Sequence, residues 1–281
     1  MTNDGPKISI VIPTYGRADY LKKLVKSISE TVPANNYEII IISSDLPDSE
    51  KISWLKNQEN VQVILADSRS SNQKRKKSLY YYTNIGIKHS KFHWVFVVND
   101  DMRFDSEWYR FFSEDVKQDV DASIGMIIAA THIGDINLGC RIATIGRVKK
   151  NNSAWKDLYL SDISIIRREV LEQIGYFDEG LDWFGSGMDN TLSIELLTDR
   201  KILPDERIKI THYITDEHRE VGVGRAFYDF NYLKKKWDKW CKNNDCEYEC
   251  NFGVEEYSLI NRLRYFFIRL KVKINRQDKR M

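Results

Sequence analysis

Two carboxylates and an amide, at Asn99, Asp100 and Asp101, directly follow an apolar run from Val95 to Val98. That run is rich in β-branched residues, which is typical of a buried strand. Carboxylates crowded at the end of such a strand repel each other unless a positive charge lies beside them. A divalent cation that carries a diphosphate would supply this charge, because Mg²⁺ and Mn²⁺ prefer oxygen ligands. The alternative interpretation is an Asx turn, since Asn and Asp favour turns.

Two other apolar runs end in polar clusters of the same kind. Residues 8–12 are followed by the loop 13–17, and residues 38–42 are followed by the loop 43–48. In parallel sheets, ligands bind beyond the carboxyl ends of the strands. We therefore expect these two loops and the acidic segment 99–101 to lie together at one edge of a sheet.

The elements that must position these loops alternate between strands and helices. Strands are expected near residues 8–12, 38–42, 61–65, 94–98, 124–130, 162–167 and 208–210. Helices are expected near residues 18–30, 72–90, 106–117, 169–174, from 189 onward, 227–242 and 255–274. This alternation predicts an α/β fold with a Rossmann-like, mostly parallel sheet flanked by helices and followed by a C-terminal helical extension.

Four ordered segments make the chain resemble the family 2 glycosyltransferases, which have the GT-A fold. They are the first strand with its loop (10–17), a helix end at 84–87, the acidic segment 99–101, and an acceptor-side segment at 175–189. The acidic segment matches the family's Asp-x-Asp motif in an Asn-x-Asp variant. The likeness covers roughly residues 7–212, and the order and spacing of the segments make it specific.

The resemblance implies roles around the leaving diphosphate. Asp101 would coordinate Mn²⁺ or Mg²⁺, while Asn99 and Asp100 would contact the ribose and the phosphate region. A second metal ligand is expected after a later strand, and His212 is favoured over His218 for that role. The ion would act as a Lewis acid on the leaving group.

The resemblance also implies a nucleotide-sugar site, with a UDP-sugar favoured as the donor. Its expected residues are Pro13, Thr14, Tyr15, Arg17 and Asp45. The family commonly has an Asp pair where this chain has Ser-Ser-Asp at 43–45. The carboxylate expected to contact the base is therefore that of Asp45, which lies one position later in the sequence than the family's Asp pair.

On the acceptor side, the resemblance makes Asp189 the general base that removes the proton of the acceptor hydroxyl. The family usually has Glu-Asp where this chain has Met188-Asp189, and Asp182 is the alternative base. A carboxylate stabilised by the dipole of its helix is another interpretation of Asp189. Trp183 and Gly185 would form a platform for the sugar and the acceptor, or belong to the core.

These roles predict a metal-dependent, inverting glycosyltransferase that uses a hydroxyl of a glycan or a lipid-linked glycan as acceptor. One alternative is transfer to modified bases of nucleic acid, such as phage DNA, because residues 74–77 and 262–273 are basic. Another is a nucleotide-sugar binding module without catalysis, which Met188 and the Ser-Ser pair at 43–44 would favour.

Charge and hydropathy bound the organisation of the chain. The net charge is only +2, which gives no global signature of a nucleic-acid binder. We divide the chain into a catalytic domain, 1–220, with a nucleotide half (1–103) and an acceptor half (104–220), and a basic helical extension, 221–281. The amphipathic pattern at 255–281 suits packing on the domain, an anionic membrane surface or nucleic acid.

No apolar run approaches the ~18 residues that span a bilayer, and the N-terminus lacks the pattern of a secretory signal. The expected location is therefore the cytoplasm, with peripheral contact at the inner face of a membrane as an option. Cys241, Cys246 and Cys250 do not have a common zinc-binding spacing. We expect these thiols to be reduced and without a metal.

Overall fold

The computed structural model describes residues 5–47, 49–66, 78–133, 142–151, 153–160, 163–182, 184–213 and 216–250. The strands are β1 (Ile8–Thr14), β2 (Tyr37–Ser43), β3 (Val61–Leu65), β4 (Trp94–Val97), β5 (Met102–Phe104), β6 (Ile124–Ile133), β7 (Thr144–Lys150), β8 (Lys156–Tyr159), β9 (Ser164–Arg167), β10 (Lys201–His212) and β11 (Cys246–Cys250). The helices are α1 (Ala18–Thr31), the short 3₁₀ helix η1 (Ala34–Asn36), α2 (Glu50–Lys56), α3 (Leu79–His89), α4 (Trp108–Gln118), α5 (Arg168–Ile174), α6 (Ser186–Leu197) and α7 (Asp216–Asn244).

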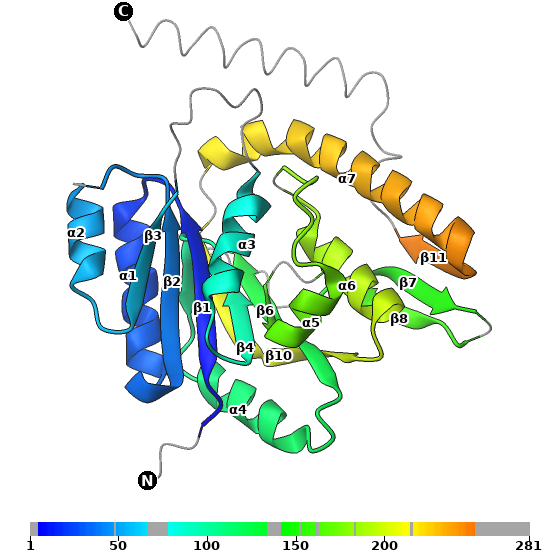
Figure 1. Ribbon diagram of the computed structural model, residues 1–281, viewed down its shortest axis with the longest axis horizontal. Helices are drawn as coiled ribbons and strands as arrows, with labels where there is room; N and C mark the ends of the chain where they lie inside the picture. Colours follow the sequence, from blue (N-terminus) through cyan, green and yellow to red (C-terminus); the bar gives the residue numbers. More distant parts are fainter. Residues whose placement is uncertain are drawn as a thin grey trace, which may run out of the picture.

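The main sheet has the strand order β3-β2-β1-β4-β9-β6-β10-β5. Figure 1 labels β3, β2, β1, β4, β6 and β10 of this sheet. Its first four strands are parallel, as are β6 and β10. The strands β9 and β5 run antiparallel to their neighbours. A second, three-stranded sheet has the order β11-β7-β8. The predicted α/β fold, with a mostly parallel sheet flanked by helices, is confirmed.

The two faces of the main sheet carry separate apolar cores because successive side chains of a strand alternate between its faces. In β1, Ile10 and Ile12 belong to the core under α1, α2 and α4, whereas Val11 belongs to the core under α3, α5, α6 and α7. All three side chains are fully buried. Burial on both faces explains why the sequence of this strand is continuously apolar.

Gly86 lets α3 pack directly on the parallel half of the sheet. A Cβ atom at this position would lie 2.4 Å from side-chain atoms of both Val11 and Ile42. The same helix is fixed at Asn84, whose side chain donates to the carbonyl of Phe177 and accepts from its amide. The segment 84–87 therefore joins the first strands to the segment that follows α5.

The long helix α7 belongs to the second of these cores. Leu233 and Trp237 are buried there together with residues of α6, and Figure 1 shows α7 crossing above α3 and α6. This part of the predicted extension 221–281 thus packs on the first 220 residues. The division at residue 220 stays a prediction, and residues 251–281 lie outside the described residues. Within the described part, no helix is long and apolar enough to cross a bilayer.

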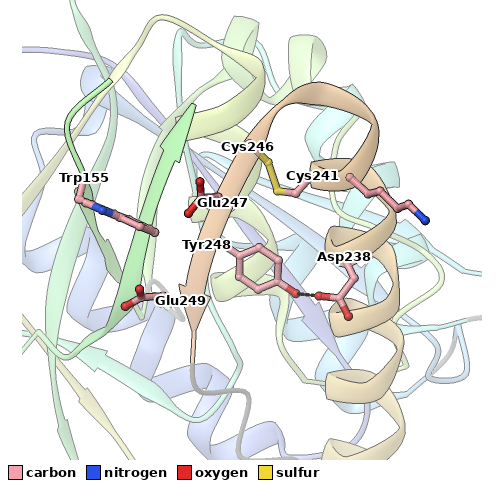
Figure 2. A pocket seen from close by; sticks show the side chains of 8 residues that line it. Trp155, Asp238, Cys241, Cys246, Glu247, Tyr248 and Glu249 are labelled. Carbon is pink, nitrogen blue, oxygen red and sulfur yellow. Dashed lines mark hydrogen bonds between the residues drawn. A yellow bond between two sulfur atoms is a disulfide. The ribbon is translucent and has the colours of Figure 1, made fainter. Parts of the chain in front are cut away.

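The expectation of reduced thiols is wrong for one pair of cysteines. Cys241 near the end of α7 and Cys246 at the start of β11 form a disulfide (Figure 2). The chain turns between the two elements and brings their Cα atoms to 4.6 Å, which is a suitable separation for a disulfide. Cys250 is a free thiol, and Cys140 lies outside the described residues.

We predict that Gly86→Ala lowers the free energy of unfolding by about 1–3 kcal/mol, because the added methyl group overpacks the contact of α3 with β1 and β2. Helix propensity alone would change stability in the opposite direction, by up to about 1 kcal/mol. Urea unfolding of the wild type and the variant measures the sign. An unchanged or increased stability would contradict the close packing at this helix.

Candidate active site

The ends of β1 and β4 bring the first two predicted site residues together. These strands pair in parallel, and the hydroxyl of Thr14 donates to Asp100 Oδ2 at 2.7 Å. Asp100 and Asp101 are 5% and 7% exposed, whereas Asn99 is exposed to solvent. The acidic segment therefore places both carboxylates inside the strand ends and leaves its amide outside.

The end of β10 adds His212 to the same place. Strand β10 pairs with β5, which begins one residue after the acidic segment, and this pairing sets His212 opposite Met102. The amide of Tyr213 donates to the carbonyl oxygen of Asp101 at 2.8 Å. As a result, His212 Nε2 lies 3.2 Å from Asp101 Oδ1. His218 is part of α7, and its side chain lies outside the described residues.

Arg17 places a guanidinium group between the two carboxylates. Its Nη1 atom lies 3.0 Å from Asp100 Oδ1 and 2.6 Å from Asp101 Oδ2. Gly16 and Arg17 both have positive φ, at 68° and 46°, and a left-handed non-glycine residue costs about 1–3 kcal/mol. The two charged hydrogen bonds offset this strain. We call Thr14, Arg17, Asp100, Asp101 and His212 the strand-end cluster.

The two neighbouring carboxylates have pKa values displaced in opposite directions. Burial raises the pKa of Asp100, and the hydrogen bond from Thr14 and the charge of Arg17 only partly oppose it. Burial also acts to raise the pKa of Asp101, but His212 and Arg17 outweigh it, so that this pKa is lowered. Asp101 is therefore the carboxylate that stays ionised most readily.

The Asp101–His212 pair fits two ligands of one metal ion. Asp101 Oδ1 is buried and accepts no hydrogen bond of ordinary geometry, yet it faces His212 Nε2 at 3.2 Å. Two ligand atoms that each lie ~2.1 Å from an ion, at right angles, are ~3.0 Å apart. No group of three or more His, Cys, Asp or Glu residues suitable for a metal occurs among the described residues. The remaining ligands of an ion here would come from a substrate or from water.

The end of β2 is tied to the loop after β1 by Asp45 and Lys51. Asp45 accepts from the amide of Gly16 at 3.0 Å and from the hydroxyl of Ser43 at 2.7 Å, and it forms an ion pair with Lys51. Lys51 Nζ also donates to the carbonyl of Gly16 at 2.7 Å and to the hydroxyl of Thr14 at 3.3 Å. Burial opposes these partners, but the pKa of Asp45 is still lowered.

Lys51 is a site residue that the sequence analysis missed. It is 6% exposed, although it lies at the start of α2, where lysines are usually solvated. Its spacing of four residues from Leu55, which is fully buried, places both on one face of the helix. That spacing was the available signal, because a lysine on the apolar face of a helix needs a partner inside.

Large apolar side chains are exposed at the ends of three adjacent parallel strands. Tyr15 follows β1 and is 75% exposed, Leu46 follows β2 and is 49% exposed, and Leu65 ends β3 and is 39% exposed. Pro13, in contrast, is buried within β1. Exposed apolar side chains therefore occur at or just after the ends of all three of these strands.

The predicted general base, Asp189, lies in the first turn of α6 and contacts α7. Its carboxylate oxygens both accept from Lys236 Nζ at 2.8 Å, and Oδ1 also accepts from Trp237 Nε1 at 2.8 Å. Asp189 is only 2% exposed. Burial raises its pKa, and Lys236 opposes that effect. The position of Asp189 in the first turn of α6 is compatible with a general base and with a carboxylate stabilised by the helix dipole, and it tests neither interpretation.

The neighbouring acceptor-side residues are fixed by the same helix. Gly185 has a φ of 83° and lies so close to Leu233 that an added Cβ would approach its Cδ1 atom to 2.5 Å. Asp229 accepts from the amides of Asp182 and Phe184. The side chain of Asp182 is exposed, and Trp183 lies outside the described residues, as do the basic residues 74–77.

An open hollow lies at the C-terminal end of α7 and differs from the strand-end cluster in its lining (Figure 2). Trp155, Tyr248 and the Cys241–Cys246 disulfide contribute to its lining. Its carboxylates are already paired: Asp238 with Lys234 and Tyr248, Glu247 with Lys149, and Glu249 with Arg147. This hollow also lies beside the small antiparallel sheet and not beyond the carboxyl ends of parallel strands, where the ligands of such sheets bind. The strand-end cluster is therefore the stronger candidate for a site that binds a charged substrate.

Comparison with known proteins gives a match that includes most of β1, the loop after it and the acidic segment 99–101, whereas His212 lies beyond the matched residues. Residues 9–175 match the family described as Glycosyl transferase family 2. The dolichol-phosphate mannosyltransferase of Pyrococcus furiosus is 31% identical over 122 residues, which are 42% of this chain and 32% of that protein. This chain therefore matches about a third of the length of that relative.

Solved structures resemble the fold at low sequence identity. The crystal structure of S. aureus TarS 1–349 has a TM-score of 0.56 at 17% identity, over 80% of this chain and 64% of that chain. The crystal structure of GalNAc-T7 with UDP, GalNAc and Mn²⁺ has a TM-score of 0.55 at 17% identity, over 75% of this chain and 44% of that chain.

We predict that Lys51→Met lowers the free energy of unfolding by about 3–5 kcal/mol, because it leaves Asp45 and the loop after β1 without their buried cation. Urea unfolding measures this loss. Lys56→Met is the matched control, since Lys56 lies on the same helix and is exposed. Equal stabilities of the two variants would contradict the structural role of Lys51.

Proposed function

Because the chain belongs to glycosyl transferase family 2 and has the GT-A fold, we propose that it moves a sugar from a nucleoside-diphosphate sugar to a hydroxyl acceptor. The strand-end cluster carries this proposal, since Arg17 and His212 flank the carboxylates of Asp100 and Asp101 at the ends of parallel strands. Fixed charges of both signs at such a sheet edge suit a ligand with phosphate groups and a cation.

The nucleotide is proposed to lie over the ends of β1, β2 and β3. The exposed side chains of Tyr15, Leu46 and Leu65 offer an apolar surface for a base, and Thr14 and Asn99 border it on the side of the cluster. A UDP-sugar is the favoured donor. The solved neighbours whose names include UDP or UDP-GlcNAc support this choice by likeness of fold. Asp45 forms an ion pair with Lys51 and accepts a hydrogen bond from the amide of Gly16. Through these contacts it is proposed to fix the loop that borders the base.

Mn²⁺ or Mg²⁺ is proposed to bind at Asp101 and His212, with the diphosphate completing its ligands. A bound ion would act as a Lewis acid that stabilises the charge of the leaving diphosphate. Arg17 would place a second positive charge beside the phosphates, because its guanidinium is already held at the cluster. The GalNAc-T7 structure, whose name includes Mn²⁺, supports a metal by analogy.

The transfer is proposed to be a single displacement with inversion. The acceptor oxygen attacks the anomeric carbon, the bond from that carbon to the diphosphate oxygen breaks, and the electron pair leaves with the diphosphate. Asp189 takes the proton of the acceptor hydroxyl. A carboxylate whose pKa is raised by burial, as that of Asp189 is, is a better base than an exposed one. Gly185 and Trp183 are proposed to border the acceptor.

The acceptor is proposed to be a glycan or a lipid-linked glycan, and the mannosyltransferase named for dolichol phosphate supports a lipid-linked one. Nucleic acid and membrane contact would depend on basic segments outside the described residues. A cytoplasmic location, with peripheral contact at the inner face of a membrane as an option, is likewise a proposal. A nucleotide-sugar binding module without catalysis, which Met188 and the Ser-Ser pair at 43–44 would favour, is the alternative of another class.

We predict that UDP together with Mn²⁺ raises the melting temperature of the wild type by about 5 °C or more at saturating ligand, because a ligand of the native state stabilises it. Asp101→Asn and His212→Ala each remove one proposed metal ligand, so both variants lose the part of the increase that requires Mn²⁺. Differential scanning fluorimetry with UDP, with Mn²⁺ and with both measures these shifts.

Asp121→Asn is the control for these variants, because Asp121 has an exposed side chain and lies beside Lys201 at the start of β10, whereas His212 is at the opposite end of that strand. It retains the full response to UDP and Mn²⁺. A Mn²⁺-dependent increase of wild-type size in both Asp101→Asn and His212→Ala would contradict the proposed metal ligands. The absence of any response to UDP in the wild type would contradict the proposed donor class.

A further inference from the structure

One face of α7 packs on the acceptor-side segment, 175–189. Its residues recur at intervals of three and four: Asp229, Tyr232, Leu233, Lys236 and Trp237. Tyr232 lies against Gly180, where an added Cβ would come within 2.4 Å of its hydroxyl oxygen. The other four residues of this face also contact the segment: Asp229, Leu233, Lys236 and Trp237. All five residues of the face therefore contact the acceptor-side segment.

Lys236 is the charged centre of this face. Its Nζ atom lies 2.8 Å from both oxygens of Asp189 and 2.8 Å from Asp178 Oδ2. Asp178 is held in turn by the amide of Gly180 at 2.8 Å and by the hydroxyl of Tyr232. One ammonium group thus joins a carboxylate in the first turn of α6 to a carboxylate in the loop after α5.

The two carboxylates differ in exposure. The side chain of Asp189 is 3% exposed and that of Asp178 is 18% exposed, while the side chain of Lys236 is 31% exposed. The groups that face Asp189 are Lys236 and Trp237 from α7 and Asp178 from the loop after α5. Tyr232, also from α7, donates its hydroxyl to Asp178. A buried carboxylate without a counter-ion would become neutral instead of staying charged.

We propose that Lys236 is a positioning residue of the transfer reaction, which orients Asp189 and keeps it ionised so that it can accept a proton. This inference rests on the proposed function, in which Asp189 is the general base. Lys236 itself forms no bond to the sugar and gives up no proton. Its two hydrogen bonds fix the direction of the carboxylate. Its positive charge offsets the free-energy cost of burying that carboxylate in the ionised form.

Asp178 has a separate part in this arrangement. When Asp189 accepts the proton of the acceptor hydroxyl, it loses its charge, and its attraction to Lys236 falls. Asp178 keeps its charge, because its pKa is lowered by Lys236 and its other hydrogen bonds in spite of burial. Asp178 therefore holds the ammonium group in place while Asp189 passes between its two protonation states.

The helix that provides Lys236 lies outside the matched family segment, which ends at residue 175. Asp178 and Asp189 also lie beyond residue 175, so all three groups of the positioning contact belong to the C-terminal part of the chain. Two parts of α7 make separate contacts. Residues 229–237 contact the acceptor-side segment, and Cys241, one turn further along, forms the disulfide with Cys246.

The test is the pH dependence of kcat for release of UDP from UDP-GlcNAc, UDP-GalNAc and UDP-glucose, with Mn²⁺ and the full-length chain. A base that must be ionised gives a rate that falls as the pH decreases through its pKa. Lys236→Met removes the positive neighbour of Asp189 and is expected to move this acidic limb up by about 1–3 pH units. Asp178→Asn removes a negative neighbour and is expected to move the limb down.

Lys236→Arg keeps the charge and is expected to retain a limb near that of the wild type. Lys235→Met is the matched control, because Lys235 is the adjacent, exposed lysine of α7, and its profile should coincide with that of the wild type. If Lys236→Met does not fold, the downward shift in Asp178→Asn and the preserved limb in Lys236→Arg still decide the matter.

Profiles of Lys236→Met or Asp178→Asn that coincide with that of an active wild type would overturn the role of Lys236 and leave the proposed function standing. A merely structural role would lower the rate at every pH without moving the limb. If the wild type releases UDP from none of these donors at any pH, the proposed function fails, and the role of Lys236 fails with it.

Discussion

The structure depends on the pairing of carboxylates that lie inside strand and helix ends with cations from other elements. A buried charge costs several kcal/mol unless it is paired and hydrogen-bonded. Arg17 pairs with Asp100 and Asp101, and Lys236 pairs with Asp178 and Asp189. Each cation thereby joins segments far apart in sequence, so the same contacts that neutralise the site also determine the shape of its loops.

The strand-end cluster and the Lys236–Asp189 pair differ in their exposure to solvent. Arg17 and His212 are each about a quarter exposed, which leaves the strand-end cluster open to a ligand. Asp189 is closed over by α7, and Lys236 is the more exposed member of the pair. The proposed donor side is thus an open edge of a parallel sheet, whereas the proposed acceptor side is enclosed by α7, which is not part of that sheet.

The sequence predicted the parts of the fold and the site that follow from local pattern. Continuous apolar runs identified β1 and β4, and polar residues after them located Thr14, Arg17 and Asp101 correctly at one sheet edge. The strand β5 was missed, because it has only three residues and is defined by pairing with β10. The basic helix expected from residue 72 begins at Leu79 in the described chain.

Lys236 and the disulfide could not be predicted from charge or spacing, and for Lys51 only its spacing from the buried Leu55 gave a signal. A lysine in an amphipathic helix is usually solvated, and whether it is buried depends on a partner elsewhere in the chain. Asp45 and Asp189 are those partners. Cys241 and Cys246 are likewise joined by the turn from α7 into β11, which the spacing of the cysteines does not specify.

The most direct measurement of the central claim is the position of Mn²⁺ in crystals grown with UDP, located from anomalous scattering at the manganese edge. The account predicts a peak within about 2.1–2.4 Å of Asp101 Oδ1 and His212 Nε2, with the diphosphate on the other side of the ion. Ordered UDP with a manganese peak elsewhere, and none between Asp101 and His212, would contradict it.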